Sequence, residues 1–398
     1  MVRWKWKPVV LVLVLVLGAL SWAGCGTKTS AGLSTRSTTS QQPVDGGTLV
    51  YSVPTLSSID PAYVTQVEAL EVVQALFDSL TQLDYKTNKV LPAVAQSWEK
   101  NASATVWTFH LKKGTTFHNG REVVAEDFKY AWERIANPAN ESPVSYHLAP
   151  IKGFDEMQNK TAKELSGVKV IDRYTLQVTL KYPFADFDAV VAHPCLAPVP
   201  KEEVEKDPKA YAMKPIGNGP FQMAESWKPD EYAKLVRYQG YAGTKPHIAG
   251  IEFRTQKDTD TAFMEFKAGT IDVAQIPDGQ IAAVESEYGV STDGLTADPG
   301  KQTLLGPELS MCYLEMNTKV APFNKADVRR AVSLAINRQA ICDVVFEGTR
   351  VAADDFIPQG MTGYVKGAGP TVVMTPPRRR RCSQALAIRT AGVCRSCS

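Results

Sequence analysis

The sequence predicts an α/β protein built of several mixed lobes. Strand-like and helix-like patterns alternate along the chain without an internal repeat, which argues against a solenoid. With 398 residues the chain is long enough for two or three domains, each with its own core. Hydrophobic residues make up 44% and charged residues 22%, which is typical of a folded globular protein.

Residues 1–24 are predicted to be a secretory signal peptide. Three basic residues within the first seven positions precede an unbroken apolar run, Val9–Leu17, and small residues follow before Cys25. The apolar run is shorter than the ~20 residues that a bilayer crossing needs. The sequence therefore predicts an exported protein.

The stretch around Cys25 allows two processing outcomes. "WAGC" resembles a bacterial lipobox, although Trp22 stands where an aliphatic residue is usual, and "SWA" also fits the site of ordinary signal peptidase. Residues 25–46 are rich in Ser, Thr and Gly, as in a tether that holds a domain off a surface. We therefore favour lipidation of Cys25, with several acyl chains, because one chain alone binds a membrane weakly.

The ordered chain is expected to begin at Gly47. Residues 48–53 are rich in apolar and β-branched side chains and predict a strand, which Pro54 stops. Residues 68–84 predict one amphipathic helix, because apolar side chains recur at helical spacing. Its apolar face comprises Leu70, Val73, Leu76, Phe77 and Leu80.

The middle of the chain alternates quickly between the two patterns. Residues 105–111 alternate as a strand does, and residues 124–135 predict a helix with Phe128, Trp132 and Ile135 on one face. Residues 169–180 have a hairpin pattern, and residues 248–256 predict another strand.

Two further helices are predicted towards the end. Residues 259–276 indicate a helix that ends at Gly269, followed by a short strand. Residues 327–346 predict one long helix. Its apolar stripe comprises Val328, Ala331, Leu334 and Ala335.

The sequence offers little catalytic or metal-binding apparatus. It contains no nucleophile-elbow, phosphate-loop, zinc-protease or dinucleotide motif. No two of the five histidines stand four apart on a helix, so a metal site would need partners from afar; His110 and His118 flank one hairpin and are the pair expected to approach. We predict no catalytic residue, no metal and no cofactor.

The three internal cysteines, Cys195, Cys312 and Cys342, are predicted to be buried free thiols, with pairing of two of them left open.

An exported, tethered chain of several α/β lobes suits ligand capture, since large pockets favour domain interfaces. Without residues 371–398, which carry six arginines and no acid, 38 basic residues face 42 acidic ones. This mildly acidic body gives no reason to expect a nucleic-acid partner. A binding protein is therefore favoured over an enzyme.

The chain resembles the oligopeptide- and dipeptide-binding proteins that serve bacterial ABC importers. The strongest match is "VWTFHLKKGTTFHNGREVVAEDFKYAWERI". Further segments agree in order: "TLSSIDP", "LAPVPKEEVEKD", "PIGNGPFQM", "FMEFKAGTIDVAQIP" and "YLEMNTKVAPFNKADVRRAVSLAINRQAI". The resemblance runs from about Gly47 to about Gly363, and "RYQGYAGTKP" departs from the family pattern.

The resemblance implies a type II periplasmic-binding-protein fold, with two lobes and three domains that close on the ligand by a hinge. It assigns residues 47–75 and 195–305 to lobe I, residues 76–194 to a subdomain packed on lobe I, and residues 306–370 to the start of an incomplete lobe II. In the oligopeptide branch the peptide lies extended and pairs through its main chain.

The resemblance also implies a set of ligand-binding residues. "TLSSIDP" places Thr55, Leu56 and Ser57 where the family presents backbone to the peptide, and "PIGNGPF" places Asn218 in a ligand-facing loop. "YLEMN" matches Tyr313 and Glu315 to a tyrosine and an acid of the site. Tyr146 matches a pocket tyrosine with spacing that differs by one. Tyr313 could instead be core in a strand, and Asn218 could serve only its turn.

The implied function is capture of extracellular oligopeptides by a monomeric receptor that delivers them to an ABC permease in the membrane. A dipeptide, nickel or other small-solute ligand is the alternative within the family. A secreted hydrolase with an unrecognised site is the alternative from another class.

Residues 371–398 are predicted to be an aberrant tail. Re-read with a shifted frame, the stretch from Val373 becomes "YDPAEAPALLAGAGYPDGGGLP", which resembles the family's helix and turn expected here. A nucleic-acid arm is a poor explanation of Arg378–Arg381 in an exported protein, and a zinc site at Cys382, Cys394 and Cys397 lacks a fourth ligand.

We therefore predict a frameshift, in the gene or in its sequencing, between about Gly363 and Val373. Translation of the underlying DNA in all frames tests this prediction, which fails if no family-like frame continues. A frameshift in the organism would leave a defective receptor without measurable peptide affinity.

Overall fold

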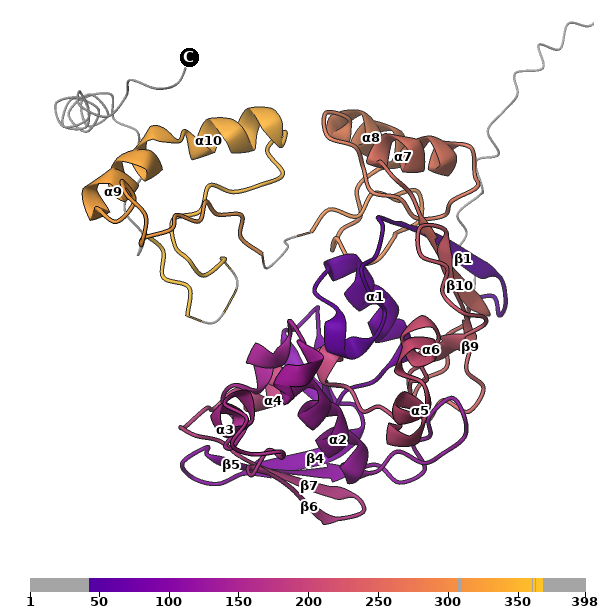
Figure 1. The fold of residues 1–398 in the computed structure, drawn as a ribbon. Coiled ribbons are helices and arrows are strands. Elements are labelled where there is room, and N and C mark those ends of the chain that lie inside the picture. Colours follow the sequence, from indigo (N-terminus) through magenta and orange to yellow (C-terminus); the bar gives the residue numbers. More distant parts are fainter. Residues whose placement is uncertain (1–42, 307–309, 360, 362, 368–398) are drawn as a thin grey trace, which may run out of the picture. The chain divides into compact units, whose positions relative to one another are not determined.

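The computed structural model describes residues 43–306, 310–359, 361 and 363–367 (Figure 1). The predicted signal peptide, the lipidation site Cys25, most of the predicted tether and the tail from residue 371 lie outside these described residues. Within the described part, no helix is both long enough and apolar enough to cross a bilayer.

The first sheet joins segments that lie far apart in the sequence. Its four strands run in the order β1 (Thr48–Val53), β10 (Gly250–Thr255), β9 (Tyr232–Arg237) and β8 (Phe221–Met223). β1 is parallel to β10, and the other neighbours are antiparallel. Figure 1 shows β1, β10 and β9 side by side. The strands predicted over 48–53 and 248–256 are therefore confirmed.

The second sheet is antiparallel and is formed by the middle of the chain. Its strand order is β4 (Ala95–Lys100), β5 (Val106–Leu111), β7 (Thr175–Thr179), β6 (Val168–Asp172). β5 alternates buried and partly exposed side chains, as its sequence predicts, and β6 and β7 form the predicted hairpin. A separate two-stranded hairpin consists of β2 (Thr81–Asp84) and β3 (Lys89–Pro92).

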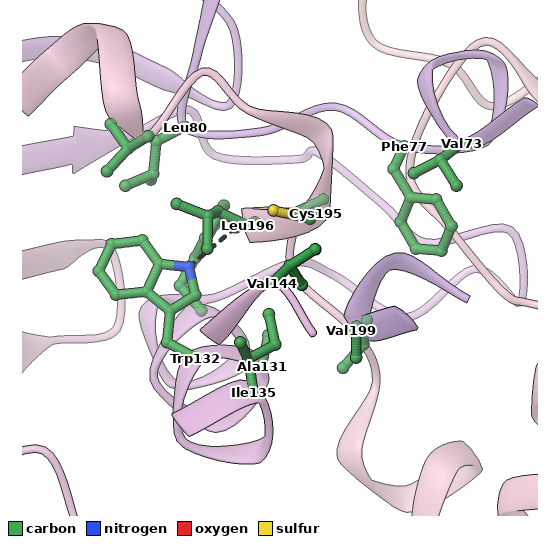
Figure 2. Close-up of a cluster of buried hydrophobic side chains, with 14 of the residues drawn as sticks. Val73, Phe77, Leu80, Ala131, Trp132, Ile135, Val144, Cys195, Leu196 and Val199 are labelled. Carbon is green, nitrogen blue, oxygen red and sulfur yellow. Dashed lines mark hydrogen bonds between the residues drawn. The ribbon is translucent and has the colours of Figure 1, made fainter. Parts of the chain in front are cut away.

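Helix α2 (Ala125–Ala136) forms where its amphipathic pattern predicts it. Phe128, Trp132 and Ile135 are all buried, and the carboxylate of Asp127 accepts a hydrogen bond from the backbone N–H of Val124 at the helix start. The indole nitrogen of Trp132 donates to the carbonyl oxygen of Leu196 at 2.8 Å (Figure 2). This bond fixes α2 to a segment more than sixty positions later in the chain.

The helix predicted over 68–84 is too long. α1 (Val67–Leu76) ends at Leu76, and the chain then passes through an extended segment into β2. Phe77 and Leu80 are buried as expected of apolar residues, but they project from extended backbone. The helix stops because the amide and carbonyl of Asp78 pair with the side chain of Asn218 instead of with helical partners.

The prediction of one long helix over 327–346 is also wrong. The segment divides into α9 (Ala326–Ala335), α10 (Arg338–Ala340) and a π-helical turn, η5 (Ile341–Val345). The side chain of Asn337 accepts a hydrogen bond from the amide of Ala340 and starts a new helix there. No residue of α9 is fully buried. After Gly269 the expected strand is reduced to a single bridge between Tyr51 and Val273.

Short helices complete the described part. They are α3 (Phe154–Gln158), α4 (Phe187–Val190), α5 (Lys201–Lys206), α6 (Pro208–Met213), α7 (Thr259–Lys267), α8 (Ile281–Tyr288) and the 3-10 turns η1 (Pro61–Tyr63), η2 (Pro138–Asn140), η3 (Ser145–Leu148) and η4 (Pro194–Leu196). One hydrophobic cluster extends from Val53 to Phe253 and includes side chains of both four-stranded sheets.

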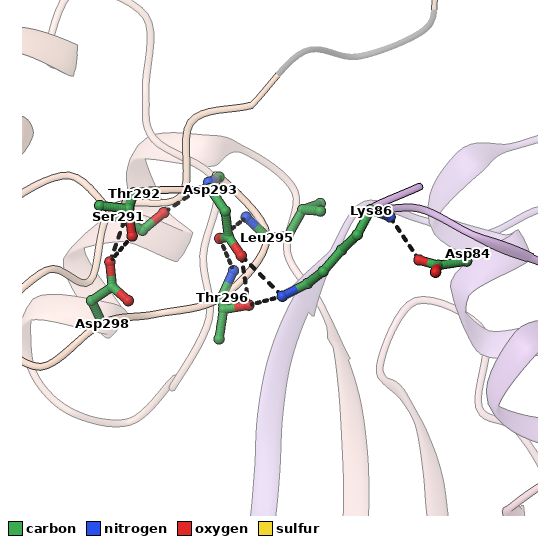
Figure 3. Close-up of polar contacts among 9 residues, drawn as sticks. Asp84, Lys86, Ser291, Thr292, Asp293, Leu295, Thr296 and Asp298 are labelled. Atoms are coloured by element: carbon green, nitrogen blue, oxygen red, sulfur yellow. Dashed lines mark hydrogen bonds and ion pairs between the residues drawn. The ribbon is translucent and has the colours of Figure 1, made fainter. Parts of the chain in front are cut away.

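The two four-stranded sheets draw on different parts of the chain, and the division into lobe I and its subdomain remains a prediction. The β1–β10–β9–β8 sheet draws only on residues 47–75 and 195–305, and the β4–β5–β7–β6 sheet only on residues 76–194. A polar contact joins the β2–β3 turn to the loop after α8 (Figure 3). There Lys86 Nζ lies 3.0 Å from Asp293 Oδ2 and 3.1 Å from Thr296 Oγ1. Because both charges are exposed, this pair contributes little to stability.

Candidate ligand-binding site

The loop after β1 carries the first predicted ligand-binding residues. Leu56 is buried, whereas Thr55 and Ser57 are exposed. The carboxamide of Gln66 accepts a hydrogen bond from the amide of Ser57 at 2.7 Å and donates to the carbonyl of Thr55 at 3.3 Å. An adjacent β-strand would make the same two bonds. Gln66 therefore occupies part of the backbone edge that was predicted to face a peptide.

A buried ion pair fixes the far end of this loop. Arg134 of α2 donates to both carboxylate oxygens of Asp60, at 2.8 and 2.6 Å, and Asp60 has no exposed side-chain surface. Burial alone lowers the pKa of Arg134, but the hydrogen bonds and charge of Asp60 more than offset this and hold the pKa above its usual range. Asp60 also accepts a bond from the amide of Ala62. The loop is thus positioned before any ligand arrives.

Asn218 lies in the turn before β8 and is almost fully buried. Its Oδ1 accepts from the amide of Asp78 at 3.1 Å, and its Nδ2 donates to the carbonyl of Asp78 at 3.0 Å. A Cβ on Gly217 would lie 1.9 Å from the carbonyl oxygen of Leu76, so only glycine fits against the end of α1. The "PIGNGPF" motif therefore locks this turn onto α1, and a ligand role for Asn218 stays a prediction.

Asp78 also borders a cavity of about 330 Å³. Lys112 and Tyr241 are among its lining residues, and the Tyr241 hydroxyl donates to Asp78 Oδ2 at 2.8 Å. Burial raises the pKa of Asp78 to about 6, against the lowering effect of the Tyr241 hydrogen bond. Tyr241 belongs to "RYQGYAGTKP", the segment that departs from the family pattern, so the resemblance gave no indication of this cavity.

We expect Asp78→Asn to stabilise the protein near neutral pH. The ordinary pKa of 3.8 applies to the unfolded chain and the raised value of about 6 to the folded protein. Between these values the folded state binds more protons, so stability falls as pH rises through this window. Since the carboxyl is partly exposed, we expect a gain of about 2 kcal/mol at pH 7.5 and none below pH 4.

Urea unfolding at the two pH values measures this difference. Asp84→Asn is the matched control. The hydroxyl of Thr87 helps to lower the pKa of the partly exposed Asp84 carboxyl, so removal of this carboxyl should reduce stability above pH 4. An Asp78→Asn variant that is less stable than the parent at pH 7.5 contradicts the prediction.

The remaining predicted site residues are exposed. The Tyr146 side chain is 64% exposed in η3, and its ring lies 4.2 Å from that of His147. Tyr313 is also 64% exposed, with its ring 5.9 Å from Phe356, and residues 310–316 form no strand, so neither the strand nor the core alternative for Tyr313 applies. Glu315 lines an open concavity of about 560 Å³ together with residues 316–319.

The hydrogen bonds of the described residues do not connect the predicted ligand-binding residues into one site. Gln66 links Thr55 and Ser57, but within the described ranges no hydrogen bond joins Tyr313 or Glu315 to that loop or to Asn218. The roles of all seven residues therefore remain predictions.

The histidines and cysteines differ from expectation. His110 pairs with Glu99 at 3.2 Å, whereas His118 bonds to the backbone of Gly217, so the pair expected to approach does not meet. Cys195 and Cys342 are buried free thiols as predicted, but Cys312 is exposed.

Two four-stranded sheets and the helices connected to them in sequence define a protein of mixed α/β type. A profile of the middle region of bacterial extracellular solute-binding proteins, family 5, matches residues 89–378. The chain belongs to this family.

Curated relatives carry names that state several ligands. The dipeptide-binding protein of Escherichia coli (strain K12) is 28% identical over 348 residues, which cover 84% of this chain and 62% of the relative. The probable deoxycholate-binding periplasmic protein YgiS of the same organism is 29% identical and covers 77% of this chain and 56% of the relative. The periplasmic oligopeptide-binding protein OppA of Salmonella typhimurium is 29% identical, with coverages of 79% and 56%. The chain thus spans 56–62% of the length of these relatives.

Solved structures agree on the fold. The murein tripeptide binding protein MppA of Escherichia coli matches with a TM-score of 0.77 at 24% identity, covering 88% of this chain and 68% of that protein. The chain therefore has the type II periplasmic-binding-protein fold that its sequence predicted.

Proposed function

We propose that this protein is the substrate-binding component of an ABC importer and captures extracellular oligopeptides. The observation that carries the proposal is the family match over residues 89–378. The peptide ligand is supported by the names of two relatives, the dipeptide-binding protein and OppA. "PIGNGPF" and "LAPVPKEEVEKD" favour the oligopeptide branch.

The loop after β1 suits main-chain recognition. Thr55 and Ser57 are exposed, and Gln66 already satisfies one amide and one carbonyl of this loop in the manner of a strand. A peptide either extends this edge or replaces the Gln66 carboxamide, and in both cases the bonds are independent of the peptide's side chains. Tyr313, Glu315, Asn218 and Tyr146 are the further residues proposed to contact it.

The proposal includes the setting of the receptor. The signal-like segment before Cys25 supports export, and the lipobox-like "WAGC" supports a lipid anchor on the outer face of the cytoplasmic membrane or a periplasmic location. The partner is an ABC permease, the receptor is a monomer, and the protein binds its ligand without catalysing a reaction. The frameshift predicted from residues 371–398 is also part of the proposal.

A second ligand class is favoured by one specific observation. The deoxycholate-binding relative is as similar to this chain as OppA, at 29% identity each. A small amphipathic solute is therefore the alternative ligand, alongside a dipeptide or a nickel complex. A secreted hydrolase is less well supported, because the relatives are named as binding proteins.

Isothermal titration calorimetry distinguishes these ligands. We would titrate dipeptides, longer peptides, deoxycholate and a nickel chelate into both the 398-residue chain and the protein with its reading frame restored. We expect the restored protein to bind the longer peptides with Kd of about 1 μM or below, and the 398-residue chain to bind none. Tighter binding of deoxycholate than of any peptide would replace the proposed ligand.

Two variants test the predicted site in the restored protein. Replacing Tyr313 or Glu315 by Ala should weaken peptide binding about tenfold or more, since each would remove a hydrogen bond to the ligand. Tyr85→Ala is the matched control, because Tyr85 is 65% exposed and has no predicted ligand role. Equal affinities in all three variants would remove Tyr313 and Glu315 from the site.

A further inference from the structure

Three potential metal ligands meet where two 3-10 turns approach each other. His147 lies in η3, and His193 and Cys195 lie at the start of η4. One ligand atom from each of the three residues can be chosen so that all lie within 4.8 Å of one another. Such a His, His and Cys set offers the imidazole and thiolate donors that Zn²⁺ prefers.

His147 has no competing hydrogen bond at one of its ring nitrogens. Its Nε2 is buried and has no partner among the described residues. The ring lies between those of Tyr146 and His193, with centroid distances of 4.2 and 4.3 Å. A buried polar atom without a partner is costly, and a bound cation would satisfy it.

The other two ligands are held in place by the surrounding backbone. The Ser79 hydroxyl donates to the carbonyl of His193 at 3.0 Å, and the Trp132 indole donates to the carbonyl of Leu196. Cys195 has no exposed surface and belongs to the apolar cluster shown in Figure 2. The amide of Cys195 donates to Nδ1 of His193, so the lone pair of the neutral ring already accepts this hydrogen bond, and His193 binds a cation only by giving it up.

We propose that His147, His193 and Cys195 bind a borderline-soft divalent cation of the Zn²⁺ type, with the fourth position taken by water. Bonds of about 2.0 Å to nitrogen and 2.3 Å to sulfur place tetrahedral ligands roughly 3.5 Å apart. The distances between the three donor atoms must therefore shorten by about 1 Å. Rotation of the His147 side chain moves its donor towards the other two, and its Nε2 gives up no hydrogen bond among the described residues. On binding, the Cys195 thiol releases its proton to solvent and the thiolate forms the metal–sulfur bond.

Metal binding would be separate from peptide capture. No residue of the trio is among the predicted peptide contacts, although Tyr146 stacks on His147. All measurements are therefore made without peptide, so that failure of the metal proposal and failure of the proposed function are distinguishable.

Cobalt provides the direct test, because a Co²⁺–thiolate bond gives a sulfur-to-metal charge-transfer band in the near ultraviolet. The 398-residue chain is compared with a variant in which every cysteine except Cys195 is replaced by Ser. This variant excludes the tail cysteines Cys382, Cys394 and Cys397. We expect the band at one Co²⁺ per chain in both proteins, and its displacement by Zn²⁺.

Two single variants complete the design. In the Cys195-only background, His147→Gln should weaken Co²⁺ binding at least tenfold, and it should fold because His147 is only half-buried. In the full chain, Cys342→Ser replaces another buried thiol and should leave Co²⁺ affinity unchanged. The proposal is overturned if the Cys195-only variant lacks the band, or if His147→Gln retains the parent affinity.

Discussion

Replacing Arg134 by Met is expected to lower the free energy of unfolding by about 3–5 kcal/mol, since removal of one partner leaves a buried charge uncompensated. Asp60 has no exposed side-chain surface, and Arg134 donates to both of its carboxylate oxygens. Without the guanidinium, the carboxylate must stay ionised in an apolar environment or take up a proton. Either outcome destabilises the loop that carries Thr55 to Ser57.

Urea denaturation of three variants separates the buried charge from the loss of packing. Asp60→Leu combined with Arg134→Met should recover much of the lost stability, because no unpaired charge remains. Arg173→Met is the matched control. Arg173 pairs with Glu122 while 60% exposed, so its loss should cost far less stability than the loss of Arg134. An Arg134→Met variant as stable as Arg173→Met would show that the Asp60 pair is not important for stability.

Trp132→Ala is expected to destabilise the protein by a similar amount, about 3–5 kcal/mol. The indole is fully buried in α2, so truncation leaves a large cavity that the surrounding β-sheet and helices cannot fill. The carbonyl of Leu196 also loses its donor. Trp132→Phe keeps most of the volume and removes the donor, so it should cost only about 1–3 kcal/mol.

Thermal and urea unfolding of both variants measure these differences. Tyr182→Ala is the control for truncating an aromatic side chain, because Tyr182 is 50% exposed. If Trp132→Phe is as damaging as Trp132→Ala, the hydrogen bond to Leu196 and not the filled volume dominates.

Local patterns in the sequence predicted several of the elements, but not β4, β8, β9 or the short helices α3 to α6. The strand over 48–53 and helix α2 follow from alternation and helical spacing, because burial of one face determines both. The helix predicted through Leu80 fails, since its continuation is decided by Asn218, 140 positions away from Asp78. Periodicity cannot report such a long-range hydrogen bond.

The candidate sites were less predictable than the fold. The resemblance indicated the loop at Thr55, but nothing in the sequence indicates that Gln66 would pair with it. Spacing predicts that His110 and His118 approach each other, whereas the structure brings the ring of His147 to that of His193. These two histidines come from separate turns, and only the packing of the chain places them side by side.

Native mass spectrometry of the frame-restored protein, purified without denaturation from a bacterial host, tests the proposed function most directly. If the protein captures oligopeptides, it should carry a mixture of short peptides that dissociate on acidification and are identified by sequencing. Recovery of the folded protein with no bound peptide, or with one non-peptide solute, would contradict the account.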